Sequence, residues 1–190
     1  MTTIVGILGS VTPPGKSLRA LEYALASARS SDPAILSIAL NLADYKIAFA
    51  DGRPPDAFAD DTAKIVREIS LADAVLILSP VYRGSFSGSL KNLLDHLPVE
   101  AIRGKPAGIV AIGATQHHFL GVDWHLRDVL AWFGALIAPT SVYLSAADFV
   151  DGAPSEAARR ELAELVATLI RLCGLRAAGP FGPPPLAARR

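Results

Sequence analysis

The stretch that decides the fold is AVLILSPVYRGSFSGSLK, residues 74–91. It begins with an apolar run, residues 74–78, that is too short for a typical helix and aliphatic enough to form a strand buried on both faces. Serine, proline and glycine then interrupt the pattern, and leucines recur afterwards at helical spacing, at positions 90, 93, 94 and 97. The order is therefore strand, tight loop and helix. In an open parallel sheet such a loop lies at the carboxyl end of a strand, where ligands bind.

The same order occurs twice more. A first strand, Thr3–Leu8, leads into the loop GSVTPPGKS, residues 9–17, and then into a helix whose apolar stripe begins at Leu18. A fourth strand, Pro106–Ile112, ends in small residues before a helix expected over residues 117–133. The pattern also predicts a strand over residues 34–40, a helix over 60–71, a strand over 136–144 and a last helix over 155–172.

Five strands that alternate with helices predict an α/β fold with a doubly wound, five-stranded parallel sheet. We expect the flavodoxin-like strand order 2-1-3-4-5, in which the first and third strands end beside the point where the order reverses. The loops after Leu8, Leu78 and Ile112 then lie along one edge. One domain is expected over residues 1–176, followed by a Pro-rich tail over 177–190 that can lie on a neighbouring subunit.

Composition excludes several classes of protein. The 190 residues can bury the core of one domain, and eighteen basic against eighteen acidic residues favour neither nucleic acid nor an anionic membrane as a partner. The single cysteine, Cys173, has no partner for an internal disulfide, as is usual in a reducing cytosol. The sequence shows neither a signal peptide nor a membrane span, so we expect a cytoplasmic protein.

The first loop is suited to a phosphate group. A strand, a loop of small residues and a helix start present free backbone N–H groups and a positive dipole end to an anion. Ser10 and Ser17 add hydroxyl donors, while Lys16 either pairs with the phosphate or remains a solvated charge. A nucleoside-triphosphate loop, GxxxxGK[ST], needs glycine where this chain has Ser10. A monophosphate therefore fits better, and an ordinary strand-to-helix turn is the structural alternative.

These loops resemble those of the flavodoxin-like NAD(P)H-dependent FMN reductases, particularly the type that supplies reduced flavin to alkanesulfonate or methanesulfonate monooxygenases. The match runs from the first strand into the fourth helix. The residues that carry it are Gly9-Ser10 with Ser17, Pro80-Val81-Tyr82 with Ser87-Gly88, Leu90-Lys91, Leu97-Pro98, Gly104-Lys105, and His118 with Val122-Asp123.

The resemblance implies an FMN-binding domain that uses NAD(P)H. The residues implied to surround the FMN phosphate are Ser10, Ser17 and Leu18. Those implied to border the isoalloxazine ring and ribityl chain are Pro80, Val81, Tyr82 and Arg83. Those implied to reach the polar edge of the ring are Gly113, Ala114, Thr115 and Gln116. No residue is assigned a catalytic step, because hydride transfer needs only two rings held at roughly 3 to 3.5 Å.

Three positions depart from the family pattern. Ala114 stands where relatives commonly have the second glycine of a pair, so the backbone approaches the flavin less closely there. Arg83 stands where lysine is common, and its planar guanidinium can make a bidentate phosphate contact, including one to the nicotinamide cofactor. Alkanesulfonate-type relatives carry an inserted aromatic or His residue in a π-bulge at the tetramer interface, and Trp124 or His125 stands at that point. The resemblance implies a bulge there.

Other chemistries are less well supported. His118 and His125 share a helix face, but His117 points about 100° away, so no metal site is expected. No GxSxG elbow or Ser-His-Asp order indicates a hydrolase. The sequence thus predicts an FMN reductase that supplies a monooxygenase. The alternatives are a reductase that retains FMN and reduces a quinone, azo dye or metal oxyanion, and a flavodoxin-like electron carrier, against which the zero net charge argues.

Two features predict contacts between subunits. The fourth helix carries apolar or aromatic residues on more than one side, so we expect a homo-oligomer, and the resemblance favours a tetramer over a dimer. The residues concerned are Leu120, Trp124, Trp132 and Phe133. The long connection over residues 41–58 is either functional, in contact with a partner subunit, or a plain surface excursion.

Overall fold

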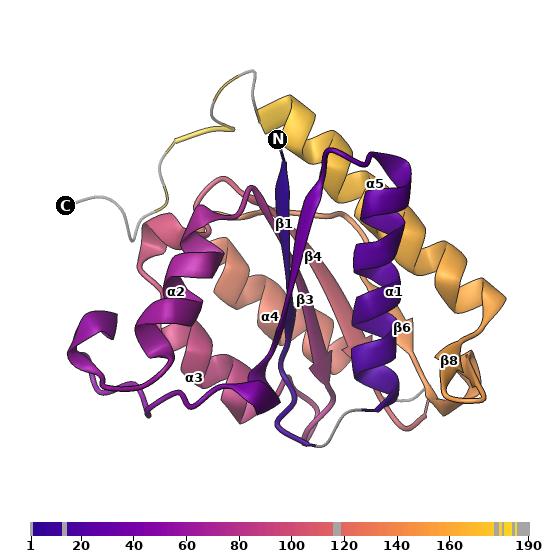
Figure 1. Ribbon diagram of the computed structural model, residues 1–190, viewed down its shortest axis with the longest axis horizontal. Coiled ribbons are helices and arrows are strands. Elements are labelled where there is room, and N and C mark those ends of the chain that lie inside the picture. Colours follow the sequence, from indigo (N-terminus) through magenta and orange to yellow (C-terminus); the bar gives the residue numbers. More distant parts are fainter. Residues whose placement is uncertain are drawn as a thin grey trace.

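The computed structural model has a parallel sheet between two layers of helices (Figure 1). It describes residues 2–12, 15–115, 119–176, 179, 181–183 and 185, without the side chains of residues 119 and 120. The strands of the sheet are β1 (Thr3–Leu8), β2 (Leu36–Asn41), β3 (Ala74–Pro80), β4 (Pro106–Ile112), β5 (Leu136–Ile137) and β6 (Val142–Leu144). They follow the order β2-β1-β3-β4-β5, with β6 also paired to β4, and these pairings are parallel. The predicted flavodoxin-like order is confirmed.

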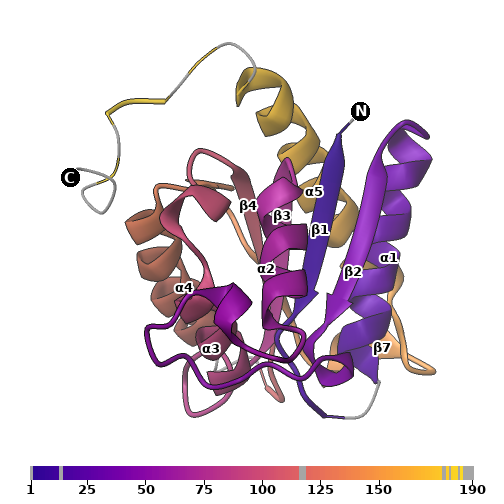
Figure 2. The ribbon, with the colours of Figure 1, turned by 60° about the vertical axis from the view of Figure 1, so that its left-hand side comes forward.

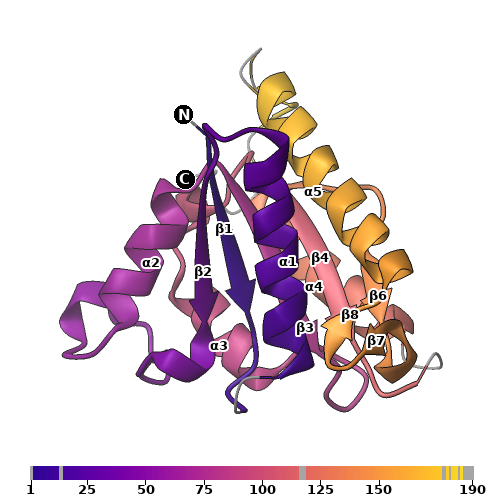
Figure 3. The same cartoon turned by 45° about the vertical axis from the view of Figure 1, so that its right-hand side comes forward.

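Helices cover both faces of the sheet. They are α1 (Lys16–Ser31), α2 (Thr62–Leu71), α3 (Gly88–His96), α4 (Phe119–Phe133) and α5 (Glu156–Arg176). Helices α1 and α5 lie on one face, and α2, α3 and α4 lie on the other (Figures 2 and 3). Short 3-10 turns occur at Leu42–Asp44, Pro55–Ala57, Val99–Ala101 and Ala146–Asp148.

Strand β3 joins the two halves of the core. Val75 and Ile77 belong to the cluster beneath α2, α3 and α4, whereas Leu76 and Leu78 belong to the cluster beneath α1 and α5. All four side chains have no exposed surface. Because successive strand residues point to opposite faces and both faces are covered, the strand is a continuous apolar run. Burial of such a side chain stabilises the fold by about 1.5–3 kcal/mol.

The predicted fifth strand over residues 136–144 is wrong in one respect, because it is divided into β5 and β6. Pro139 lies in the gap and has no N–H to donate to a ladder. Arg127 on α4 compensates for the break, since its two terminal nitrogens donate to Ala138 O at 3.0 Å and Pro139 O at 3.2 Å. The Arg127 Nε atom is paired with Asp123 at 2.9 Å. An antiparallel pair, β7 (Phe149–Val150) and β8 (Ala153–Pro154), follows and was not predicted.

Helix α4 corrects a second expectation. Its residues from Phe119 to Phe133 are regular α-helix, so the π-bulge implied at Trp124 or His125 is absent from this described part of the chain. The buried side chains recur at positions 122, 126, 130 and 133, which is the spacing of an unbroken α-helix. A bulge would shift this stripe by one residue and turn it out of the core.

The described part of the C-terminal tail lies beside its own chain. Residues 179, 181–183 and 185 border a cavity together with Arg103, Gly104 and Gly134. A β carbon at Gly134 would lie 2.9 Å from Pro185 Cγ, so the tail passes close to the turn after α4. Among the described residues no helix has the length and apolar character needed to span a bilayer.

Lys105, directly before β4, is buried and caps the end of α2. Its Nζ donates to Ser70 O at 2.6 Å and to Ile69 O at 3.2 Å. Burial, aided by the nearby charge of Arg176, lowers the pKa of Lys105 from 10.5 to about 8, although Asp73 opposes the change. The folded chain thus gives up this proton more easily than the unfolded chain.

We expect Lys105 to make the protein more stable as the pH rises from about 8 to 10.5. In this interval the unfolded state keeps the proton that the folded state has lost, so the free energy of unfolding rises, by up to about 3 kcal/mol. Urea unfolding of wild type and Lys105→Met at pH 7 and pH 10 isolates this contribution from Tyr143 and Cys173, whose pKa values burial raises. If the difference in free energy of unfolding between wild type and Lys105→Met is the same at pH 7 and pH 10, the expected contribution of Lys105 is contradicted.

Candidate functional site

Three of the predicted site segments meet at the carboxyl edge of the sheet, where β1, β3 and β4 end side by side (Figure 1). The first residue of each loop is held by a neighbouring strand. Gly9 N donates to Leu78 O at 2.8 Å, Val81 N to Ile112 O at 2.9 Å, and Gly113 N to Leu144 O at 2.9 Å. The loops therefore leave the sheet in fixed directions.

Ser87 connects the first loop to the second. It is the N-cap of α3: its Oγ accepts from Leu90 N at 3.1 Å and donates to Gly9 O. Its backbone N–H donates to Ser79 Oγ at 3.0 Å, and both serines are fully buried. A β carbon at Gly9 would lie 2.8 Å from Leu90 Cβ, so glycine is what lets the first loop approach α3.

The start of α1 leaves backbone donors free. Gly15 is its N-cap, and the helix has neither a side-chain cap nor an acidic residue in its first turn. Ser10 is buried and shares a hydrogen bond of 2.8 Å with the Thr12 hydroxyl. Leu18 packs partly against the core, while the Lys16 ammonium lies over the Phe149 ring at 5.6 Å from its centroid. This end of α1 combines unpartnered N–H groups with a nearby positive charge.

The second loop contains a tight two-residue turn. Tyr82 N donates to Ser85 O at 2.8 Å and Ser85 N to Tyr82 O at 3.0 Å. Arg83 and Gly84 between them both have positive φ, 52° and 75°. Tyr82 is 46% exposed, whereas Val81 packs partly on the core and Pro80 is half-buried. The turn thus presents the Tyr82 ring and the Arg83 guanidinium at the edge of the sheet.

Helix α4 fixes this turn from the other side. His125 Nδ1 is hydrogen-bonded to Ser85 Oγ at 2.8 Å. A β carbon at Gly121 would lie 2.1 Å from Gly84 O, so helix and turn touch through glycine backbone. His125 therefore holds the turn. Among the described residues no group of three His, Cys, Asp or Glu side chains could hold a metal ion.

The third loop is held against β6. A β carbon at Gly113 would lie 1.9 Å from the Tyr143 hydroxyl oxygen, which donates a hydrogen bond to Thr115 O. Burial, together with the Asp148 charge, raises the pKa of Tyr143, so this hydroxyl keeps its proton. Ala114 and Thr115 are exposed. The predicted residue Gln116, with His117 and His118, lies outside the described residues.

All the other predicted site residues thus lie on the three loops, in the first turn of α1 or, in the case of Pro80, at the last position of β3. Sequence reasoning missed the residues that hold the loops in place, namely Ser79, Ser87, Gly121, His125 and Tyr143. The N-cap role of Ser87 had a local signal, a serine directly before a helical leucine pattern. Ser79 acts over eight residues across the second loop, and the other three act across long sequence separations and leave no local pattern.

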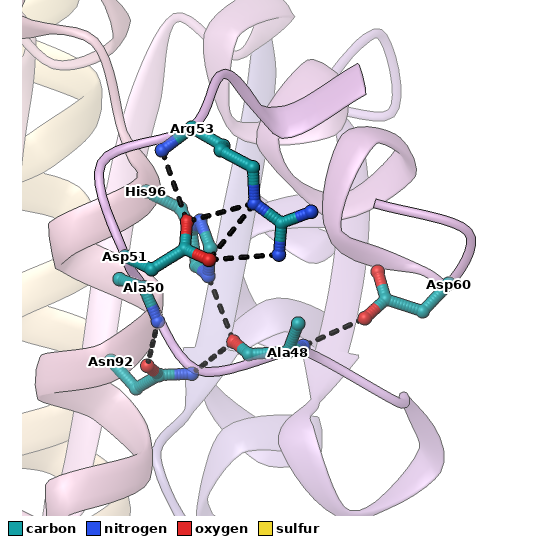
Figure 4. A network of polar contacts seen from close by, with 7 residues as sticks. All are labelled: Ala48, Ala50, Asp51, Arg53, Asp60, Asn92 and His96. Carbon is teal, nitrogen blue, oxygen red and sulfur yellow. Dashed lines mark hydrogen bonds and ion pairs between the residues drawn. The ribbon is translucent and has the colours of Figure 1, made fainter. Parts of the chain in front are cut away.

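The long connection between β2 and α2 is fastened to α3 (Figures 2 and 4). Asn92 Nδ2 donates to Ala48 O and Ala50 N donates to Asn92 Oδ1, both at 2.9 Å. His96 Nε2 also bonds Ala48 O at 2.9 Å, and Asp60 accepts from Ala48 N at 2.7 Å. The connection is thus a fixed surface.

The residues of the three loops fit FMN. The uncapped start of α1 supplies unpartnered donors for a phosphate, and the glycines at positions 9 and 113 let the first and third loops pack closely against Leu90 and Tyr143. The exposed Tyr82 ring can contact a flat ring system beside the third loop. Groups suited to a phosphate and groups suited to a flat ring therefore occur at the same edge.

Replacing Ser87 by Ala removes the cap of α3 and the bond to Gly9 O, so we expect a loss of about 1–3 kcal/mol in the free energy of unfolding. Ser89→Ala is the matched control, because Ser89 Oγ reaches the same carbonyl at 3.3 Å but is not the cap. Urea unfolding measures the loss of stability in each variant, and FMN titration measures any change in its FMN affinity. Equal losses in the two variants contradict the assignment of the connection to Ser87.

The chain is similar to known flavin reductases in sequence and in structure. Residues 2–149 match the model of a family described as NADPH-dependent FMN reductase. The chain is 36% identical over 140 residues to the NAD(P)H-dependent FAD/FMN reductase of Geobacillus thermodenitrificans, covering 74% of this chain and 75% of the relative. It is 32% identical over 179 residues to the FMN reductase (NADPH) of Pseudomonas aeruginosa, covering 94% and 92%.

Among solved structures, the apo form of the NADH:FMN oxidoreductase EmoB has the same fold, with a TM-score of 0.74 at 24% identity, over 100% of this chain and 97% of the other. The family match covers the sheet and the three loops, from β1 to β7. The chain belongs to the NADPH-dependent FMN reductase family, and it is an oxidoreductase that uses NAD(P)H and FMN.

Proposed function

We propose that this FMN reductase releases its reduced flavin to a flavin-dependent monooxygenase in the cytoplasm. The observation that carries the proposal is the solvent exposure of the residues expected to border the flavin ring. Tyr82 is 46% exposed, and Ala114 and Thr115 are exposed as well. A flavin bound against such an edge can leave without a large rearrangement of the described residues. The resemblance to flavin-supplying reductases supports the same reading.

In this proposal each loop has one task. The phosphate binds at the start of α1, with Lys16 adding positive charge; the residues around it are Ser10, Ser17 and Leu18. The ring and ribityl chain lie against the second loop, along Pro80, Val81, Tyr82 and Arg83. The polar edge of the ring meets the third loop, at Gly113, Ala114, Thr115 and Gln116.

The protein's share of the chemistry is binding and orientation. When bound, FMN accepts a hydride at N5 from C4 of the nicotinamide. The second loop covers one side of the ring and leaves the other open to the reductant. Backbone N–H groups of the third loop favour negative charge at the polar edge. None of these tasks needs a side-chain acid, base or nucleophile.

Purified protein supplied with FMN should oxidise NADPH or NADH, and the reduced flavin should leave it. A flavin-dependent monooxygenase placed behind a dialysis membrane, under limited oxygen, tests the release, because only free reduced FMN can cross. Product formation on the far side is the expected result. Retention of reduced FMN with transfer to a quinone would favour the flavin-retaining reductase, and no oxidation of either nucleotide would contradict reductase activity.

A homo-oligomer, a dimer or tetramer, is part of the proposal. A groove of about 430 Å³ between α3 and α4 has Trp132, which is 58% exposed, among its lining residues. Its apolar lining is Leu94, Leu97, Val129, Trp132 and Phe133, and its charged lining is Lys91, Asp95 and Asp128. Phe49, on the fastened connection at the other side of α3, is 84% exposed. Apolar groups held this rigidly in water favour a partner surface.

We expect Trp132→Glu to lower the molar mass in solution, as measured by light scattering, because a carboxylate cannot be buried without a partner. Trp124→Glu is the matched control on the same helix, at a side chain that does not line the groove and is 59% exposed. A monomeric wild type contradicts the oligomer. If only the Trp124→Glu variant dissociates the oligomer, the groove is not the interface between its subunits.

A further inference from the structure

We propose that Arg83 binds a phosphate of the nicotinamide dinucleotide and that the strained Tyr82–Ser85 turn positions the Arg83 guanidinium for this contact. The assignment rests on the proposed site at the second loop. It adds a contact with the reductant for a residue that the proposed site places beside the flavin ring.

The chain contains the same turn twice, with different residues. In the first, Arg83 and Gly84 have φ values of 52° and 75°; in the second, between β7 and β8, Asp151 and Gly152 have 50° and 77°. Positive φ at both central positions is the type I′ geometry, for which Asp-Gly is a favoured pair. Arginine is not favoured there, because a β carbon in the left-handed region costs roughly 1–2 kcal/mol. The turn at the candidate site is therefore the strained one.

Nothing in the described part of the chain offsets this strain. The Arg83 guanidinium is exposed and makes none of the ion pairs or side-chain hydrogen bonds found among those residues. Arg127, by contrast, is paired with Asp123 and bonded to two carbonyl groups. A strained residue without an internal partner at a binding edge is a candidate for ligand recognition.

The turn is also held rigidly, so the cation is positioned in advance. Two backbone hydrogen bonds close it, the His125 ring bonds Ser85 Oγ at 2.8 Å, and Gly121 lies against Gly84 O. A preorganised group loses less conformational entropy when it binds. The rest of the side chain remains free to reach a ligand.

The position of Arg83 separates it from the FMN phosphate. The turn contacts α4, in the helix layer opposite to α1, whose free start suits the FMN phosphate (Figure 3). A second anionic group at this edge belongs to the other ligand of the reaction. NADH brings a pyrophosphate and NADPH an additional phosphate, and a guanidinium can bind either with two parallel hydrogen bonds.

Arg83→Asn tests both parts of the proposal. Asparagine tolerates positive φ but lacks the charge, so the melting temperature of the ligand-free protein should rise by a few degrees. The affinity of the FMN-loaded protein for the 1,4,5,6-tetrahydro forms of NADH and NADPH, which cannot donate hydride, should fall about tenfold or more. FMN affinity should fall less than nucleotide affinity, because the FMN phosphate lies at the start of α1 and not at this turn. Arg83→Lys should recover part of the nucleotide affinity, and Asp151→Asn, in the matching turn, should change neither quantity.

The outcomes separate this proposal from the proposed function. Unchanged nucleotide affinity in Arg83→Asn overturns it even if the enzyme supplies flavin, and a loss that affects FMN affinity more than nucleotide affinity assigns Arg83 to the flavin alone and overturns it too. A melting temperature that does not rise overturns the strain argument. Weaker binding of the NADPH analogue alone identifies its additional phosphate as the partner, and an equal loss for both analogues identifies the pyrophosphate. These titrations report on Arg83 even if reduced flavin is never released.

Discussion

The hydrogen bond from Ser87 Oγ to Gly9 O is the contact on which the candidate site depends. Parallel strands that end together leave backbone carbonyl groups at the edge of the sheet, and a buried carbonyl without a donor is costly. Ser87 supplies that donor and at the same time accepts from Leu90 N at the start of α3. One buried hydroxyl thus fixes the first loop, the second loop and the helix behind them.

The helix layers on the two faces of the sheet contribute different parts of the site. Helix α1 contributes its free start on one face, and α4 holds the Tyr82–Ser85 turn on the other through His125 and Gly121. Close approach of backbone at glycine recurs in all three loops. The result is a rigid edge with exposed recognition groups, which suits a protein whose ligands must both bind and leave.

Much of this arrangement could be predicted from local pattern. The β3 run was recognisable as a strand because both of its faces are buried, and the three loops followed from strand, small residues and helix in that order. The break between β5 and β6 had a local signal in Pro139, which has no N–H for the ladder, but the compensating contacts of Arg127 come from another element and could not be predicted. The implied π-bulge was wrong, since the buried stripe of α4 keeps an unbroken helical spacing. The contacts of His125 and Tyr143 with the loops likewise exist only in the folded chain.

The most direct test of the account is a crystal structure of the protein with FMN. We predict that the phosphate lies at the start of α1 beside Ser10 and Ser17, and that the ring lies between the Pro80–Tyr82 segment and the third loop. The Ser87–Gly9 bond and the Tyr82–Ser85 turn should be unchanged from the ligand-free protein. An FMN phosphate bound away from α1, or loops that must separate at Ser87 to admit the ring, would contradict the account.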